Sequence, residues 1–190
     1  TAMNPSTDAV LERTAALIRE HAVPMLGADY AAGQLQRGAV LLSAAQKAQL
    51  QRLMWPDGKL SAAVTGQSAR VIAERAGLGE IAALGPRILM VDEDGFGPEH
   101  PYSGEKLSPV LTLYAARDFD AALRVVERIY AYQGAGHSVG LHSARPERAL
   151  QLGLSLPVSR VIVDQAHCIA TGGSFDNGLP FSLSMGCGTW

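Results

Sequence analysis

The chain has 190 residues, 47% of them hydrophobic and 18% charged, and its formal net charge is −2. A chain of this length and composition can bury one sizeable core, which favours a single globular α/β domain. Its nearly balanced charge excludes a generally basic surface, so we expect no nucleic acid partner.

Targeting signals and cysteines restrict the compartment. No apolar run approaches the length of a membrane span, and the first residues lack the basic and apolar pattern of a signal peptide. We therefore expect a cytoplasmic protein without a membrane partner. The two cysteines, Cys168 and Cys187, allow at most one disulfide, which a domain of this size does not need. Both are predicted to be reduced thiols.

The first part of the chain is predicted to be helical. Residues 8–21 place apolar side chains on one side and charges on the other, which indicates an amphipathic helix, and residues 23–38 are a glycine-containing connector. Ser43 and Gln46 have the spacing of a capping box and open a second helix that runs to about Met54.

The middle of the chain alternates between strand and helix patterns. A short strand is predicted at residues 60–64, and a helix at residues 67–76 that ends at Gly77. Residues 86–91 and 110–114 are continuous apolar runs of strand length, as expected for buried parallel strands.

The same alternation continues toward the C-terminus. Asp118 is a good N-cap for a helix over residues 119–132, and strands are predicted at 138–142 and 160–163, with a short helix near Pro146 between them. The fold class is therefore α/β, with a largely parallel sheet and helices on both of its faces.

Two loops are candidates for ligand binding. Residues 92–108 form a connection too long for a turn, and such connections are often functional. In parallel sheets, ligands sit at the carboxyl ends of strands, where residues 104–109, 142–145 and 167–177 could converge. The tail after Gly172 is rich in glycine, which allows another group to approach the backbone closely, and we expect this group to be a ligand.

Several stretches resemble the catalytic domain of CoA-acylating aldehyde dehydrogenases, and the branch acting on acetaldehyde or sulfoacetaldehyde is the most similar. They occur in the family's order: Ala62-Ala-Val-Thr-Gly-Gln67, Gly104-Glu-Lys-Leu-Ser-Pro-Val110, Gly134-Ala-Gly-His-Ser138, Arg160-Val-Ile-Val-Asp-Gln165 and Gly172 to Trp190. The resemblance covers residues 38–190 as a catalytic domain with an apparently truncated C-terminus. Residues 1–37 are a divergent N-terminal helix and connector.

The resemblance implies a cofactor site for NAD or NADP. Residues 105–110 match the family's Glu-x-Phe-Gly-Pro-Val element, so Glu105 and Pro109 are predicted to bind the cofactor, Glu105 at the nicotinamide ribose. A carboxylate suits this task because it accepts two hydrogen bonds from a vicinal diol. The alternative for Glu105 is a solvated surface charge. Lys106 is expected to be a solvated lysine.

The resemblance also implies a substrate or CoA site. His137, in the family's Gly-x-Gly-His element, is predicted to meet a thioester carbonyl or a CoA phosphate, or else to fix the local turn. Ser174 and Asn177 lie in a loop whose backbone amides could hold an anion, the alternative being a plain surface loop. His142 is expected to pack structurally, and His100 has no assigned role. No metal site is predicted.

The family's nucleophile is not expected in this chain. Aldehyde oxidation needs a cysteine thiolate, and the family's cysteine motif lies upstream of residue 38, where residues 1–37 contain no cysteine. Cys168 and Cys187 are predicted to be buried and non-catalytic. We therefore expect neither a catalytic residue nor a nucleotide-binding domain in these 190 residues, and no aldehyde turnover by them alone.

Two functions follow from the resemblance. The first is part of a CoA-acylating dehydrogenase that oxidises a small aldehyde, of the acetaldehyde or sulfoacetaldehyde type, to an acyl-CoA with NAD or NADP, with CoA as acyl acceptor. The second is a non-catalytic paralogue or fragment that binds acyl-CoA or a partner subunit. In either case the resemblance implies a homo-oligomer.

Overall fold

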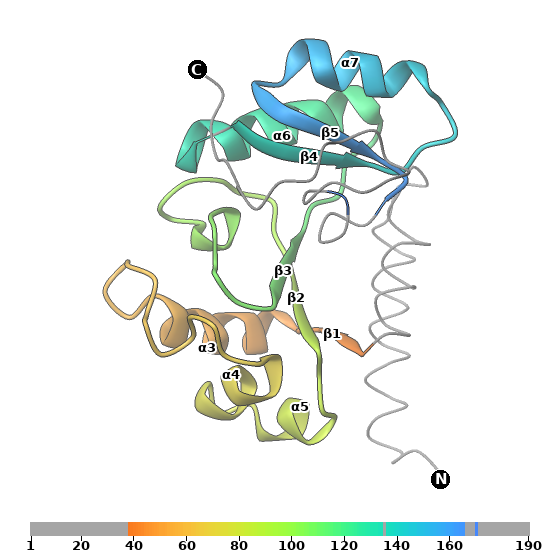
Figure 1. Ribbon diagram of the computed structural model, residues 1–190. Coiled ribbons are helices and arrows are strands. Elements are labelled where there is room, and N and C mark those ends of the chain that lie inside the picture. Colours follow the sequence, from red (N-terminus) through yellow and green to blue (C-terminus); the bar gives the residue numbers. More distant parts are fainter. Residues whose placement is uncertain (1–37, 135, 166–169, 171–190) are drawn as a thin grey trace, which may run out of the picture. The chain divides into compact units, whose positions relative to one another are not determined.

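A computed structural model of the chain describes residues 38–134, 136–165 and 170 (Figure 1). The predicted helix at 8–21 and the glycine-rich tail lie outside these residues. The chain divides into two compact units, residues 1–125 and 126–190. None of the helices in the described residues combines the length and the apolar character that crossing a membrane requires.

The first unit contains a parallel sheet of three strands in the order β1-β2-β3. Its strands are β1 (Ala39–Leu41), β2 (Ile88–Asp92) and β3 (Val110–Leu113). Leu89 of β2 is aligned with Val110 of β3, and Ala39 of β1 with Ile88 of β2. Both predicted strands are confirmed, although β3 is buried only at Val110 and half-buried beyond it, whereas β2 is buried over residues 89–91. Their parallel pairing agrees with the predicted α/β class.

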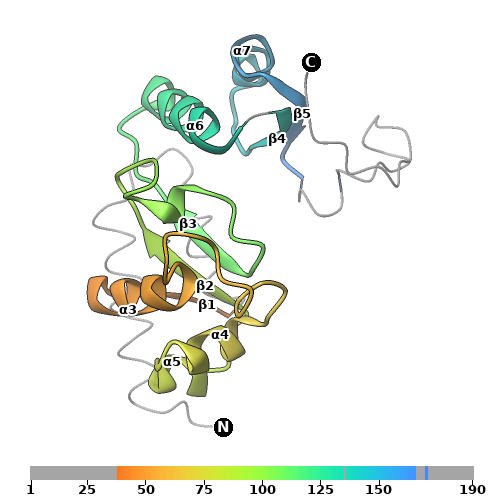
Figure 2. The same ribbon diagram turned by 90° about the vertical axis from the view of Figure 1, so that its left-hand side faces the viewer.

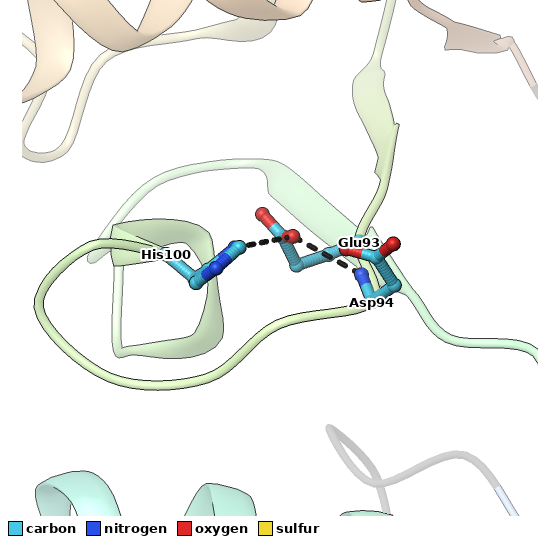
Figure 3. Close-up of side chains that lie close together, drawn as sticks. All are labelled: Glu93, Asp94 and His100. Atoms are coloured by element: carbon cyan, nitrogen blue, oxygen red, sulfur yellow. Dashed lines mark hydrogen bonds and ion pairs between the residues drawn. The ribbon is translucent and has the colours of Figure 1, made fainter.

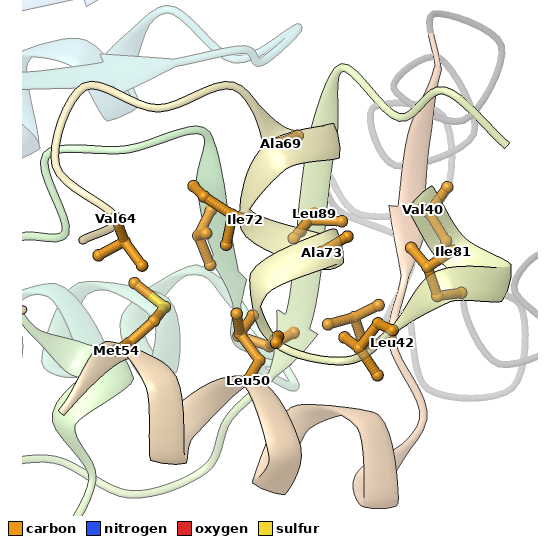
Figure 4. Packing of buried hydrophobic residues seen from close by; sticks show 14 of the residues in the cluster. Val40, Leu42, Leu50, Met54, Val64, Ala69, Ile72, Ala73, Ile81 and Leu89 are labelled. Carbon is orange, nitrogen blue, oxygen red and sulfur yellow. The ribbon is translucent and has the colours of Figure 1, made fainter. Parts of the chain in front are cut away.

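Helices α3 (Ala44–Met54), α4 (Ala69–Arg75) and α5 (Gly79–Ala83) cover one face of this sheet (Figures 1 and 2). Side chains alternate along a strand, so β1 and β2 send every second residue toward these helices. Figure 4 shows the resulting core, in which Leu50, Met54, Ile72 and Leu89 are fully buried. The opposite face carries a smaller cluster with Ala39, Leu41 and Met90.

Local capping sets the ends of these helices. Ser43 accepts a hydrogen bond from the Gln46 amide, and the Gln46 side chain accepts one from the Ser43 amide, which completes the predicted capping box. Helix α4 begins two residues later than predicted, because Ser68 is its N-cap. Beyond its last turn lies Gly77, whose φ of +73° suits glycine.

The strand predicted at residues 60–64 is wrong. This stretch is a series of turns in which the Val64 amide donates to the Ser61 carbonyl and the Ala63 amide to the Ser61 side chain. Local serine bonds of this kind compete with strand pairing. Val64 is nevertheless fully buried in the core, which explains the apolar pattern that suggested a strand.

The second unit is built on a pair of parallel strands. Strand β4 (Gly136–Leu141) pairs with β5 (Val158–Val163), and helix α7 (Glu147–Ser155) packs on β5. Helix α6 (Phe119–Gln133) crosses the division between the units and begins at the predicted N-cap Asp118, which accepts a bond from the Ala121 amide.

His142 follows β4 and was expected to pack structurally, but its side chain is exposed. Its Nδ1 lies 3.6 Å from Oδ1 of Asp164, which is also exposed. The same carboxylate accepts a hydrogen bond from the Ser143 amide. His142 is thus at the surface of the strand ends rather than in the core.

Candidate functional site

The loop between β2 and β3 begins with a buried carboxylate. Glu93 follows the carboxyl end of β2, and its side chain is only 4% exposed. Its Oε2 lies 2.9 Å from Nζ of Lys47 on α3. Its Oε1 accepts hydrogen bonds from the amides of Asp94 and Gly95 and lies 2.9 Å from Nδ1 of His100 (Figure 3). Both oxygens of Glu93 are therefore occupied by protein groups.

These contacts keep Glu93 charged. Burial by itself raises the pKa of a carboxyl group. Here the hydrogen bonds from Lys47, the Gly95 amide, His100 and the Asp94 amide outweigh burial and lower the pKa of Glu93 to about 2. At neutral pH the residue is an anion paired with the Lys47 ammonium.

The same geometry bears on metal binding. Glu93, Asp94 and His100 place possible ligand atoms within 4.8 Å of one another. The Lys47 ammonium already lies against Glu93 Oε2, and two amides and His100 already contact Oε1. A dication there would face this ammonium, so the arrangement functions as an ion pair that holds the loop.

Gly95 lets the loop close on itself. A Cβ atom at this position would lie 2.2 Å from Nδ1 of His100, so only glycine permits the close approach of the ring. The Gly95 carbonyl accepts a hydrogen bond from the Tyr114 hydroxyl, and the Tyr114 ring stacks on Phe96. Burial and the charge of Glu93 raise the pKa of Tyr114 to about 12, so it remains a donor.

Tyr102 is a second anchor of the loop. It lies in a short 3₁₀ helix (Pro101–Ser103) and is fully buried, with its ring edge-on to Trp55. Its hydroxyl donates to the Lys47 carbonyl at 2.8 Å, and its own carbonyl accepts from the Thr112 hydroxyl at 2.7 Å. Burial and the charge of Glu93 raise the pKa of Tyr102, so it too stays protonated.

Lys106 is not the solvated lysine that was expected. Its side chain is partly buried, and Nζ donates to the carbonyls of Tyr102 at 2.9 Å and Gly104 at 2.7 Å. Burial lowers the pKa of Lys106 to about 8, although the neighbouring charge of Glu105 opposes this change. Through these two bonds the lysine holds the turn that contains Glu105. The local sequence did not indicate this role.

The predicted cofactor residues, Glu105 and Pro109, lie in the last part of the same loop. Glu105 is exposed at the tip of this turn, where a ligand can reach it. The Pro109 carbonyl accepts a bond from the Leu89 amide at 3.0 Å and so joins the end of the loop to β2. Between them, Leu107 has a φ of +44°, and its carbonyl accepts from the Gly66 amide at 2.9 Å. A leucine with positive φ is strained, and such strain persists where surrounding contacts hold the backbone.

The other predicted site residues are less fully described. His137 lies on β4, between the paired residues Gly136 and Ser138. Ser174, Asn177 and both cysteines lie outside the described residues. The convergence of the strand-end loops and the predicted roles of these side chains stay predictions.

Sequence reasoning missed Glu93, Lys47 and His100 as a connected group. One signal was present, because the acidic run Asp92–Asp94 directly follows a buried strand, where parallel sheets place functional groups. Nothing local indicated that Lys47, on a helix far earlier in the chain, would be the partner of Glu93.

Comparisons with known proteins agree on one family. The chain is 67% identical over 153 residues to a sulfoacetaldehyde dehydrogenase (acylating) from Cupriavidus necator, covering 80% of this chain and 31% of that protein. The chain spans about a third of the length of such curated relatives. No protein-family model matches it.

Solved structures show the same fold. A probable aldehyde dehydrogenase from Listeria monocytogenes is 33% identical with a TM-score of 0.63, over 72% of this chain and 29% of that one. A Rhodopseudomonas palustris propionaldehyde dehydrogenase with bound propionyl-CoA has a TM-score of 0.65 at 20% identity, over 82% and 33%. An engineered glycolyl-CoA reductase with bound NADP+ has a TM-score of 0.64 at 17% identity, over 94% and 41%.

Proposed function

The chain belongs to the family of CoA-acylating aldehyde dehydrogenases, and from this premise we propose that it is part of an enzyme that oxidises sulfoacetaldehyde to its acyl-CoA with NAD or NADP. The observation that carries the proposal is the 67% identity to an acylating sulfoacetaldehyde dehydrogenase, extending over 80% of the chain. The predicted fold class and family are thereby confirmed. The choice of aldehyde rests on this relative.

The described residues fit a nicotinamide cofactor at one point. Glu105 is exposed between Gly104 and Lys106, which are joined by a hydrogen bond from Lys106 Nζ to the Gly104 carbonyl. A carboxylate held on such a turn can accept hydrogen bonds from both hydroxyls of a ribose. A nicotinamide cofactor held there would supply the hydride acceptor for the oxidation. Glu105 would orient the ribose, and Pro109 would fix the end of the loop on β2.

The acyl acceptor and the substrate anion involve the second part of the chain. We propose that His137, Ser174 and Asn177 contact CoA or the sulfonate group, as the family resemblance implies. An imidazole near backbone amides can stabilise charge on a thioester carbonyl or bind a phosphate. A homo-oligomer in the cytoplasm remains part of the proposal.

The substrate test uses the full protein that contains this chain. We expect sulfoacetaldehyde, CoA and NAD or NADP together to produce reduced nicotinamide and a sulfoacetyl-CoA detectable by mass spectrometry, with acetaldehyde a poorer substrate. A preference for acetaldehyde would overturn the substrate assignment. Acyl-CoA binding without any turnover would instead support the non-catalytic alternative.

The cofactor test is Glu105→Gln. It should lower turnover by roughly ten- to a hundredfold, about 1.4 to 2.7 kcal/mol of transition-state stabilisation, because the ribose loses a charged acceptor. Glu99→Gln is the matched control, since Glu99 is an exposed carboxylate of the same loop. Equal kinetics of the two variants would remove Glu105 from the cofactor site.

The acyl acceptor test is His137→Ala in single-turnover kinetics. The variant should slow CoA-dependent acyl release more than the first reduction of the cofactor, because the imidazole is assigned to CoA and not to the hydride step. An equal loss in both phases would indicate that His137 only maintains the local structure.

A further inference from the structure

We propose that Lys47 and Glu93 are positioning residues for the cofactor, because their buried ion pair fixes the loop that carries Glu105. The inference rests on the proposed role of Glu105 and adds residues that do not touch the ligand themselves. It predicts that the placement of Glu105, and not only the stability of the fold, depends on a contact with helix α3.

Lys47 attaches to the loop at two places. Its Nζ lies 2.9 Å from Glu93 Oε2 and donates to the Asp92 carbonyl at 2.5 Å, where the loop begins. Its backbone carbonyl accepts a hydrogen bond at 2.8 Å from the hydroxyl of Tyr102, a residue that lies three positions before Glu105. One helical residue therefore holds both the start of the loop and the segment next to the predicted cofactor ligand.

The inner part of the loop connects these two points. His100 contacts Glu93 with its ring, and its carbonyl accepts bonds from both the amide and the hydroxyl of Ser103. The Ser103 hydroxyl in turn accepts a bond from the Gly97 amide at 3.1 Å. A displacement of Glu93 would therefore be transmitted through His100 to the 3₁₀ turn that precedes Glu105.

Hydrogen bonds also hold the residues on both sides of Glu105. Lys106 Nζ binds the carbonyls of Tyr102 and Gly104, so the residues that flank Glu105 are tied to the Tyr102 anchor. Thr112 on β3 binds the same Tyr102 carbonyl. A network of hydrogen bonds thus connects the backbone next to Glu105 with the Lys47–Glu93 ion pair. This network is the frame that holds the loop.

The ion pair is the point at which this frame can be loosened selectively. Removing the Glu93 charge is the milder change, because it leaves no buried carboxylate without its cation, and the Lys47 side chain, which is 23% exposed, can still be solvated. In Glu93→Gln, the amide oxygen can still accept the Asp94 and Gly95 bonds. The amide nitrogen then faces the Lys47 ammonium as donor against donor, so the contact with α3 is lost first.

The experiment is a double-mutant cycle on cofactor affinity in the full protein. Dissociation constants for NAD and NADP are measured by titration for wild type, Glu93→Gln, Glu105→Gln and the double variant. We expect Glu93→Gln to weaken binding by about tenfold in the wild-type background and by less than about twofold when Glu105 is already Gln, because residues that act through one another are not additive.

Two further variants and a stability measurement distinguish a positioning role from misfolding. Lys47→Gln removes the charge from the helix side while keeping a hydrogen-bond donor, and it should reproduce the dependence on Glu105. Glu99→Gln should leave affinity unchanged. The thermal midpoint of each variant is measured in parallel, since a purely structural role would lower it without making the loss of affinity depend on Glu105.

The outcomes separate this inference from the proposed function. If Glu105→Gln weakens cofactor binding but Glu93→Gln and Lys47→Gln do not, the positioning role is wrong and the function of Glu105 stands. Equal losses in both backgrounds also overturn the inference. If Glu105→Gln has no effect on the cofactor, the proposed role of Glu105 fails and the positioning role fails with it.

Discussion

The two units of this chain bury their apolar residues to different depths. In the first unit, Leu50, Ile72 and Leu89 are fully buried between helices and a parallel sheet. In the second, Leu150 and Leu154 on α7 are 67% and 79% exposed, and the described sheet has only two strands. Because these exposed leucines leave apolar surface outside a core, we expect the described part of the second unit to have the lower local stability.

The difference extends to charged groups. The first unit has exposed ion pairs, such as Arg70 with Glu74, but it also has a buried one, in which Lys47 meets a carboxylate that is 4% exposed. In the described part of the second unit, the paired side chains of His142 and Asp164 are 47% and 60% exposed. Removing one partner of a buried ion pair strongly lowers the stability, whereas removing one partner of an exposed pair changes it little. The loop that begins at Glu93 is therefore held by a pair that should be sensitive to mutation.

The largest expected effect comes from truncating a buried leucine of the first unit, compared with an exposed leucine of the second. Leu89→Ala should destabilise the protein by about 2 to 5 kcal/mol because it leaves a cavity in a fully buried site. Leu154→Ala, at an exposed position, should change the free energy of unfolding by less than about 0.5 kcal/mol. Urea unfolding followed by circular dichroism measures both. A comparable loss for Leu154→Ala would show that this surface of α7 is covered in solution.

Acid should affect the first unit through Glu93. Its pKa is about 2 in the folded protein against an ordinary value of 4.5, so the folded state binds fewer protons between these values. The resulting stability is fully present above pH 4.5 and is lost as the pH falls toward 2. Its upper bound is about 3 kcal/mol.

The measurement is urea unfolding across this pH range with Glu93→Gln as the reference. The variant should have a flatter dependence between pH 4.5 and 2 than the wild type. Parallel curves would mean that Glu93 is not held as an anion by Lys47 and the loop amides.

Helix capping gives a smaller contrast. Ser43→Ala removes the capping box of α3 and should cost about 1 kcal/mol. Ser155→Ala, at an exposed position in the last turn of α7, should be neutral within about 0.5 kcal/mol. Chemical unfolding of the two variants under identical conditions decides this. A neutral Ser43→Ala would indicate that tertiary packing alone holds the start of α3.

The smallest effect is expected for the exposed ion pair. Asp164→Asn should change stability by no more than about 0.5 kcal/mol, because the pair is solvated and asparagine tolerates the φ of +53° at this position. Thermal unfolding at low and high salt tests this, with Glu93→Gln as the buried counterpart. A larger loss at Asp164 would remove the electrostatic distinction between the units.

The local elements and the family could be predicted from the order of the amino acids. Ser43, Gly77 and Asp118 marked helix ends because capping involves residues only a few positions apart. The apolar runs at β2 and β3 predicted buried parallel strands for the same local reason. The ordered motifs also indicated Glu105 and Pro109 as candidates for cofactor binding.

The way in which the candidate loop is held depends on contacts between segments that are far apart in the chain. Val64 was predicted to lie in a strand, but it lies in a turn and its side chain is buried in the core. Lys106 was predicted to be solvated, but its Nζ donates to the carbonyls of Tyr102 and Gly104. The pairing of Lys47 with Glu93 joins a helix to a loop far along the chain. Such contacts depend on the spatial order of the strands and on burial, and neither follows from neighbouring residues, because the energy of a charge is set by what surrounds it in the fold.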